Sequence, residues 1–197
     1  ISILWLNAAL SCDGESVALT DATQPSIEDL IGGAIPGIPR VRFFHPLLAY
    51  ELGEDFLSTF REAAADKIGD FILVVEGSIP DESLAENGYF ASFGNDEKTG
   101  EPIKVCEWIE SLARNAWAVV AMGTCSAYGG IHAMSGNPTG AMGLPDYLGW
   151  DWRSKAGLPI VCVAGCPTLP DNMTQTLLYL LQQFSGIVPM IELDESL

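Results

Sequence analysis

Positively charged residues are scarce in this 197-residue chain, which has nine lysines and arginines against 26 aspartates and glutamates. Its formal charge of -17 at pH 7 repels phosphate backbones and anionic membrane surfaces, so we expect no nucleic-acid partner. Long apolar runs are also missing, and no segment reaches the roughly 20 apolar residues of a transmembrane helix. Residues 1–7 suit a strand rather than a leader. We therefore expect a cytoplasmic protein, either soluble or peripherally associated with a membrane through partners.

Cysteine is too infrequent for a disulfide scaffold, because five cysteines in a chain of this length are few and odd in number. This usage indicates a reducing compartment and a metal-binding or catalytic role. The glycine patterns G-x-G-x-x-G and G-x-x-x-x-G-K-[ST] are absent, which argues against dinucleotide and P-loop phosphate binding. A flavin phosphate site is disfavoured as well, because the loop after the first strand carries acids instead of many hydroxyls.

Short apolar runs rich in β-forming residues recur along the chain and alternate with helical patterns or Gly/Pro-rich loops. The runs are residues 1–6, 41–48, 70–77, 116–123 and 158–165. Helices are predicted over 26–33, opened by Ser26, over 51–67, over 103–115, and from an N-cap at Asp171 to the residue before Gly186. The stretches 81–100 and 126–158 show no strong period and are expected to be functional loops. This alternation predicts a doubly wound α/β fold, a parallel sheet with helices on both faces.

Potential ligands follow four of the predicted strands. Cys12 and Glu15 follow the first strand, Glu76 the third, Cys125 the fourth and Cys166 the fifth. Open parallel sheets bind ligands beyond the carboxyl ends of their strands, so these side chains are expected to meet at one edge.

Three thiolates and one carboxylate would complete four ligands for zinc or for an iron–sulfur cluster. Asp13 competes with Glu15 as the carboxylate ligand. Cys106 and Cys162 are expected to serve packing, because free cysteine is among the most buried residue types. His45 and His132 are expected to be structural.

The motifs ILWLN, SCDGES, VVEGSIP, GTCSAYGGI, GNPTGA and AGCP, in this order, closely resemble the N-terminal domain of the small subunit of nickel–iron hydrogenases. The resemblance implies a flavodoxin-like fold that holds the proximal iron–sulfur cluster against a large subunit carrying the nickel–iron centre. By position, Cys12, Cys125 and Cys166 match three of the four cluster cysteines. Glu15 replaces the fourth, and the oxygen-tolerant, actinobacterial-type branch is similar in using an aspartate there.

The resemblance therefore implies that Glu15 ligates iron, in a 4Fe-4S cluster or in a 3Fe-4S cluster if the oxygen ligand does not retain its iron. Glu76, Thr124 and Ser126 are expected to surround the ligands. We expect a cluster domain over residues 1–186 and the start of a C-terminal segment over 187–197. In this family that segment leads to further clusters, for which the chain supplies no ligands.

The function implied is that of the electron-transfer subunit of a hydrogen-oxidising uptake hydrogenase, partnered by a large subunit and passing electrons to an unspecified acceptor. Two alternatives stay open at this stage. One is the cluster-binding subunit of a respiratory quinone oxidoreductase, which typically opens with paired cysteines. The other is a structural zinc module acting as an interaction scaffold.

Overall fold

A five-stranded parallel sheet forms the centre of the protein in a computed structural model that describes residues 1–191. Its strands are β1 (Ser2–Asn7), β2 (Arg42–Phe44), β3 (Phe71–Glu76), β6 (Ala118–Met122) and β7 (Val161–Val163). Their order, β2-β1-β3-β6-β7, is the flavodoxin-like order, so the predicted fold class and all five strands are confirmed. The part of the predicted C-terminal segment that spans 192–197 lies outside the described residues.

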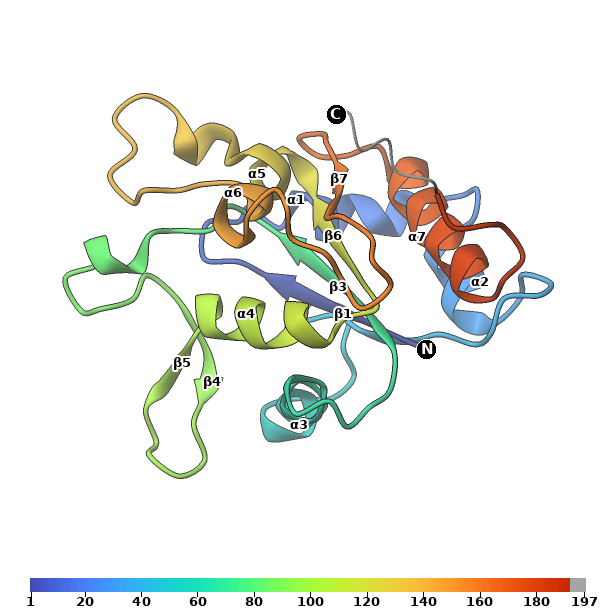
Figure 1. The fold of residues 1–197 in the computed structure, drawn as a ribbon, viewed down its shortest axis with the longest axis horizontal. Coiled ribbons are helices and arrows are strands. Elements are labelled where there is room, and N and C mark those ends of the chain that lie inside the picture. Colours follow the sequence, from blue (N-terminus) through green and yellow to red (C-terminus); the bar gives the residue numbers. More distant parts are fainter. Residues whose placement is uncertain (192–197) are drawn as a thin grey trace.

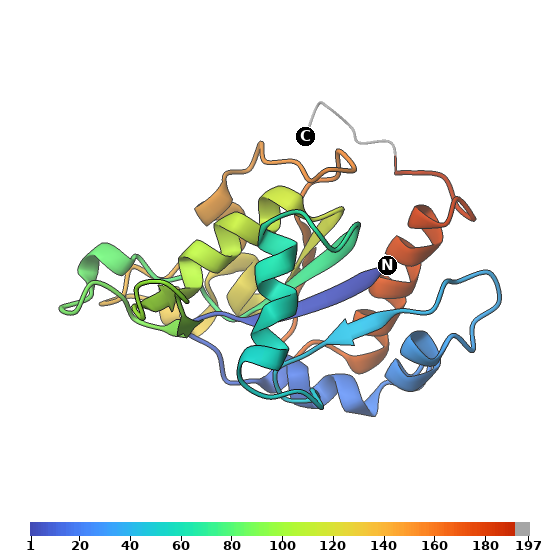
Figure 2. The same cartoon turned by 90° about the horizontal axis from the view of Figure 1, so that it is seen from below.

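Side chains alternate between two apolar layers because successive residues of a strand point to opposite faces. On one face, Leu4 and Leu6 of β1 pack with helices α3 (Glu54–Ala64) and α4 (Val105–Asn115). On the other, Ile3 and Trp5 pack with α2 (Ile27–Gly32) and α7 (Pro170–Phe184). Figures 1 and 2 show these helices on opposite faces of the sheet. Both faces are buried, which explains the nearly continuous apolar strands.

The predicted helix starts are confirmed at one position and corrected at another. Ser26 caps α2 by accepting the backbone N–H of Asp29 at 3.1 Å. Asp171 does not cap α7, which begins one residue earlier at Pro170. The Asp171 carboxylate instead accepts the backbone N–H groups of Thr23, at 2.7 Å, and Gln24, at 3.0 Å. A tertiary contact with a loop about 150 residues earlier has replaced the local cap.

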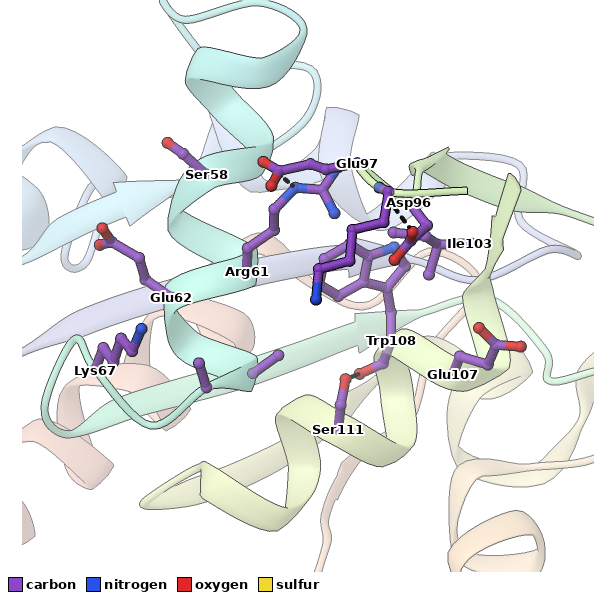
Figure 3. Close-up of a pocket in the computed structure, with 13 residues that line it drawn as sticks. Ser58, Arg61, Glu62, Lys67, Asp96, Glu97, Ile103, Glu107, Trp108 and Ser111 are labelled. Carbon is purple, nitrogen blue, oxygen red and sulfur yellow. Dashed lines mark hydrogen bonds and ion pairs between the residues drawn. The ribbon is translucent and has the colours of Figure 1, made fainter. Parts of the chain in front are cut away.

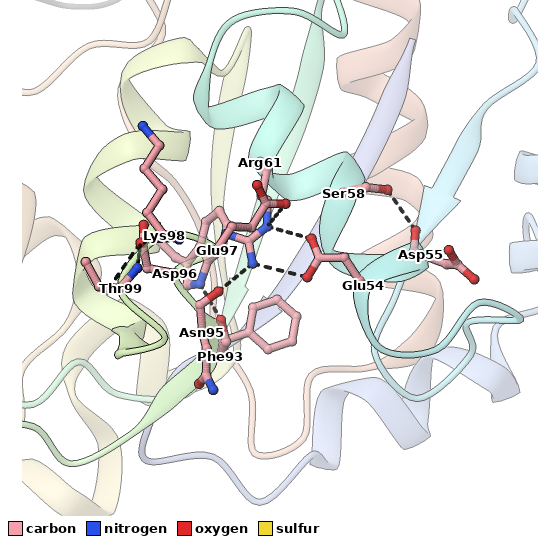
Figure 4. Close-up of polar contacts among 11 residues, drawn as sticks. Glu54, Asp55, Ser58, Arg61, Phe93, Asn95, Asp96, Glu97, Lys98 and Thr99 are labelled. Atoms are coloured by element: carbon pink, nitrogen blue, oxygen red, sulfur yellow. Dashed lines mark hydrogen bonds and ion pairs between the residues drawn. The ribbon is translucent and has the colours of Figure 1, made fainter.

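The predicted loop over 81–100 contains regular structure, and this expectation is corrected. Strands β4 (Ser92–Asn95) and β5 (Pro102–Lys104) form an antiparallel hairpin that projects from the body of the molecule (Figure 1). Arg61 of α3 binds Glu54 through two hydrogen bonds and donates to the Asn95 carbonyl at 2.6 Å (Figure 4). The Trp108 indole N–H donates to the Phe93 carbonyl at 2.6 Å. These bonds fasten the hairpin to α3 and α4.

The second predicted loop, 126–158, also contains short helices near the carboxyl ends of the strands. They are α5 (Gly123–Tyr128), η3 (Gly130–Ala133) and α6 (Leu144–Leu148), and α1 (Gly14–Ala18) follows β1 at the same edge. Figure 1 shows the strands pointing toward the side of the molecule where α5 and α6 lie. None of the helices within residues 1–191 combines the length and apolar character needed to cross a bilayer.

Candidate metal centre

The candidate site lies where the chain connections diverge at the carboxyl ends of β1 and β3. Asn7 and Glu76, the last residues of these strands, are paired in register. The loop after β1 then returns to the segment after β3, because the Ser78 backbone N–H donates to the Leu10 carbonyl at 2.9 Å. Crevices at such switch points are the usual ligand sites of doubly wound sheets.

The fully buried carboxylate of Glu76 organises this crevice by accepting four hydrogen bonds. The donors are the Trp5 indole N–H at 3.0 Å, the Asn7 amide at 3.3 Å, the Glu15 backbone N–H at 3.1 Å and the Ser16 hydroxyl. A buried carboxylate needs such partners to offset its lost hydration. Glu76 thus joins the two central strands to the start of α1.

Cys12 is exposed at the start of this crevice. Gly14, two residues later, lies near both the Cys12 sulfur and Pro167, which follows Cys166. A Cβ atom placed on Gly14 would lie 3.2 Å from the Cys12 sulfur and 3.7 Å from the Pro167 side chain. Asp13, which lies between Cys12 and Gly14 in the sequence, has the left-handed conformation with a φ of 58°. Its carboxylate accepts a hydrogen bond from the Asn7 amide. Asp13 is therefore held toward β1.

Cys125 lies in α5 and Cys166 in the loop after β7, and hydrogen bonds join these two segments. The Thr124 backbone N–H donates to the Gly165 carbonyl at 2.8 Å, and the Gly165 N–H donates to the Thr124 hydroxyl at 3.0 Å. Burial raises the pKa of the half-buried Cys125 thiol, and the nearby negative charges of Glu15 and Cys166 raise it further. The predicted ligands from three strand ends are therefore electrostatic neighbours.

Glu15 places a carboxyl group inside the crevice, where the residue is 6% exposed. Burial and the neighbouring Glu76 carboxylate raise the pKa of Glu15 to about 7. The group lies against the backbone of Gly123, where a Cβ atom would overlap the carboxylate. Gly123 also has a φ of 86°, which side-chain-bearing residues rarely adopt. The glycine of Met-Gly-Thr-Cys thus leaves room for the Glu15 carboxyl at the end of β6.

The two remaining cysteines pack in the core and do not belong to this group of candidate ligands. Cys106 is 7% exposed within α4 and packs in the core, as predicted. Cys162 is half-buried in β7 and packs against the same core. Among residues 1–191, no three His, Cys, Asp or Glu side chains are arranged to hold a single metal ion.

The three residues expected around the ligands differ in what they contact. Glu76 and Thr124 make the hydrogen bonds described above, whereas the Ser126 hydroxyl is buried without a partner among the described residues. One contact at this edge was missed from the sequence. The Ser78 hydroxyl lies 3.2 Å from Nδ1 of His132, and both belong to the same edge of the sheet. The position of Ser78, two residues after a strand end, was the available signal.

A large cavity lies elsewhere in the molecule. It has a volume of about 840 Å³ and lies between α3, α4 and the β4–β5 hairpin, as Figure 3 shows. Arg61 lines it from α3, Lys67 from the turn after α3, and Glu107 and Trp108 from α4. It contains no cysteine and mixes charges of both signs, so it does not compete with the sheet edge as the metal centre.

Comparison with known proteins agrees with this geometry. Residues 12–180 match the family described as NADH ubiquinone oxidoreductase, 20 Kd subunit. The structure of the actinobacterial-type NiFe-hydrogenase from Ralstonia eutropha H16 is 57% identical with a TM-score of 0.95, covering 100% of this chain and 57% of that chain.

Two curated relatives are similar over most of this chain. The periplasmic [NiFeSe] hydrogenase small subunit of Desulfomicrobium baculatum is 36% identical, covering 89% of this chain and 53% of its own length. The Escherichia coli K12 hydrogenase-2 small chain is 31% identical, and the match covers 91% of this chain and 42% of that chain. This chain thus spans about half the length of these curated relatives. It belongs to the NADH ubiquinone oxidoreductase 20 Kd subunit family, within which it is a member of the nickel–iron hydrogenase small subunits.

Proposed function

We propose that this chain is the electron-transfer small subunit of a nickel–iron uptake hydrogenase. The observation that carries the proposal is that Glu15, Cys125 and Cys166 are electrostatic neighbours at one sheet edge, with Cys12 three residues before Glu15 on the same connection. The likeness to the Ralstonia eutropha hydrogenase supports it. Hydrogen would be split on a separate large subunit, and this chain would receive the electrons.

The donor set suits an iron–sulfur cluster. Thiolates are the usual ligands of cluster iron, and the four side chains come from three segments of the chain. Cys12 and Glu15 follow β1, Cys125 lies in α5, and Cys166 follows β7. Gly123 and Gly130 keep the surrounding backbone close, since a Cβ at either would meet Glu15 or the Cys125 sulfur. Cys12, Cys125, Cys166 and Glu15 would hold a 4Fe-4S cluster, which supplies one-electron transfer. Loss of the iron at the weaker oxygen ligand would leave a 3Fe-4S cluster.

The chain's own residues would orient this group and control its surroundings. Glu76 fixes the start of α1 and with it the backbone position of Glu15. Thr124 holds α5, which carries Cys125, to the loop of Cys166. Because the Glu15 carboxyl retains its proton up to about pH 7 in the metal-free chain, ligation must release that proton.

A partner surface surrounds the site. Exposed apolar side chains lie on the segments that carry or follow the proposed ligands. They are Val17 (63% exposed), Tyr128 (57%), Ile131 (72%) and Leu169 (68%). A large subunit covering them would bury the cluster and exclude water from it.

The alternatives are less well supported. A quinone oxidoreductase subunit shares the family, but it typically opens with paired cysteines, which residues 11–15 of this chain lack. A structural zinc site needs four ligands about one ion, and the described residues offer no such group. A cytoplasmic location remains a prediction, and the Desulfomicrobium baculatum relative is named periplasmic.

The direct test is co-purification with the large subunit, followed by electron paramagnetic resonance before and after exposure to hydrogen. The proposal expects a nickel-containing complex whose cluster signal changes under hydrogen. Cys12→Ala should abolish the cluster signal, whereas Cys162→Ala, which removes a thiol away from the site, should retain it. A complex without nickel, or a cluster that hydrogen does not reduce, would contradict the proposal.

A further inference from the structure

Asp13 is the N-cap residue of α1, but its carboxylate does not cap this helix. An aspartate at such a position usually accepts a backbone N–H of the first helical turn. Here the Glu15 N–H of that turn donates to Glu76 at 3.1 Å. The Asp13 carboxylate instead accepts the side-chain amide of Asn7, the last residue of β1. A contact with the end of the strand has therefore replaced the local cap.

The amide group of Asn7 joins two carboxylates. Its nitrogen donates to Asp13 and, at 3.3 Å, to Glu76. An amide nitrogen carries two hydrogens, whereas an ionised carboxylate can only accept. The amide must therefore face both acids with its nitrogen, and its buried oxygen is left without a partner among the described residues. Such unpaired buried atoms are uncommon, so the bridge between the two acids is kept against the loss of one hydrogen bond.

The other bonding groups of Asp13 are engaged as well. Its backbone N–H donates to the Ser11 hydroxyl at 3.2 Å, and its carbonyl accepts the Val17 N–H at 3.0 Å. Its φ of 58° lies in the left-handed region, which aspartate enters more readily than most residues. Asp13 is therefore fixed as the corner of the 11–16 loop, between Cys12 and α1.

The two acids of this loop differ in where their carboxyl groups are held. Asp13 and Glu15 both lie within three residues of Cys12, so each is a candidate oxygen ligand. The Glu15 carboxyl lies against Gly123, the first residue of α5 and two residues before Cys125. The Asp13 carboxylate is committed to the Asn7 amide at the end of β1. Only Glu15 has its carboxyl beside the segment of a second proposed ligand.

We propose that Asn7 is a positioning residue that selects Glu15 over Asp13 as the oxygen ligand of the cluster, by holding the Asp13 carboxylate at the end of β1. This inference rests on the proposed function, because it takes Glu15 as a ligand. Without the amide, Asp13 would lose its donor and no hydrogen would separate it from the Glu76 carboxylate. Repulsion between the two charges would then drive Asp13 off the strand end and make it available to iron beside Cys12.

The test is electron paramagnetic resonance of the reduced cluster in the assembled complex. Asn7→Leu keeps the approximate size of the side chain but removes both donors, so a second signal should replace part of the wild-type signal. Adding Asp13→Asn, which tolerates the left-handed turn but carries no charge, should restore a single wild-type signal. Asn115→Leu is the matched control. This half-buried amide also donates twice, to the Ala63 and Ala64 carbonyls, and precedes β6 at the amino end of the sheet.

The outcomes separate this inference from the proposed function. A wild-type complex without a cluster signal would overturn both. A single wild-type signal in Asn7→Leu would overturn only the role of Asn7. The same holds for a second signal that survives the addition of Asp13→Asn or that appears equally in Asn115→Leu, because a purely structural defect would not be rescued at Asp13. If Asn7→Leu fails to assemble, Asn7→Ser decides the question, since it also removes the amide and an unchanged spectrum there would contradict the selection.

Discussion

The carboxylate of Glu76 accepts the backbone N–H of Glu15 at 3.1 Å, so a residue at the end of β3 fixes the position of a proposed ligand at the start of α1. The same carboxylate accepts the Trp5 indole and the Ser16 hydroxyl. The 11–16 loop therefore depends on one buried acid for its attachment to the sheet.

Replacing Glu76 with alanine should lower the stability of the folded protein, because the buried donors of Trp5 and Ser16 would lose their acceptor. We expect a loss of about 3 kcal/mol in the free energy of unfolding, measured by urea titration. Glu76→Gln keeps one acceptor oxygen and should lose less than half of that. Equal stability of Glu76→Ala and wild type would show that the loop is held by other contacts.

That the proposed ligands follow the ends of neighbouring strands was predictable from the sequence, because parallel strands end at one edge of the sheet. The contact between Ser78 and His132 was not, since the orientations of these side chains depend on the turn at Gly129 and Gly130. The β4–β5 hairpin escaped prediction because its short strands carry few apolar residues. Its attachment comes from Arg61, which lies about 30 residues earlier in the chain.

The Gly123 position tests how closely Glu15 approaches the strand end. Gly123→Ala would introduce a Cβ into the Glu15 carboxylate and force alanine to a φ of 86°, so we expect a loss of about 1–3 kcal/mol in unfolding free energy and poorer iron retention. Gly32→Ala is the control. It lies in α2 with nothing within 4 Å of the added Cβ, and should be neutral or stabilising by up to about 1 kcal/mol. Equal effects of the two substitutions would refute the close approach.

The identity of the oxygen ligand can be tested at Glu15 itself. Glu15→Cys should shift the midpoint potential and the spectrum of the cluster, because a thiolate replaces an oxygen ligand. Asp13→Ala, the matched change at the competing acid, should leave the spectrum close to that of wild type, since Asp13 is held by Asn7. A spectrum that changes with Asp13 and not with Glu15 would reverse the assignment.

His45 should make folding stability depend on pH. Burial between the rings of Trp5 and Phe43 lowers the pKa of His45 to about 4, whereas the unfolded chain titrates near 6.5. Between these values only the unfolded chain binds the proton, so unfolding free energy falls as pH decreases from about 6.5 toward 4, by up to about 3 kcal/mol.

The variant His45→Phe keeps an aromatic ring but cannot be protonated. Its stability relative to wild type should therefore increase as pH falls through this window, as measured by urea unfolding at several pH values. A difference between the two proteins that stays constant with pH would show that His45 is not held neutral by the fold.

Arg61 is expected to control the mobility of the hairpin. Arg61→Ala removes the bonds to Glu54 and to the Asn95 carbonyl, so amide hydrogens of β4 and β5 should exchange faster with solvent while those of β3 stay protected (Figure 4). Lys98→Ala, a change of the same charge on the hairpin, is the control because its side chain makes no salt bridge within residues 1–191. Unchanged exchange in Arg61→Ala would mean that the other contacts, including the Trp108–Phe93 hydrogen bond, hold the hairpin without Arg61.

The most direct measurement is the content of iron, acid-labile sulfide and zinc per chain, on protein purified without oxygen together with its partner. We predict about four irons with matching sulfide, or about three if the oxygen ligand does not retain its iron. Stoichiometric zinc without sulfide would contradict the electron-transfer function.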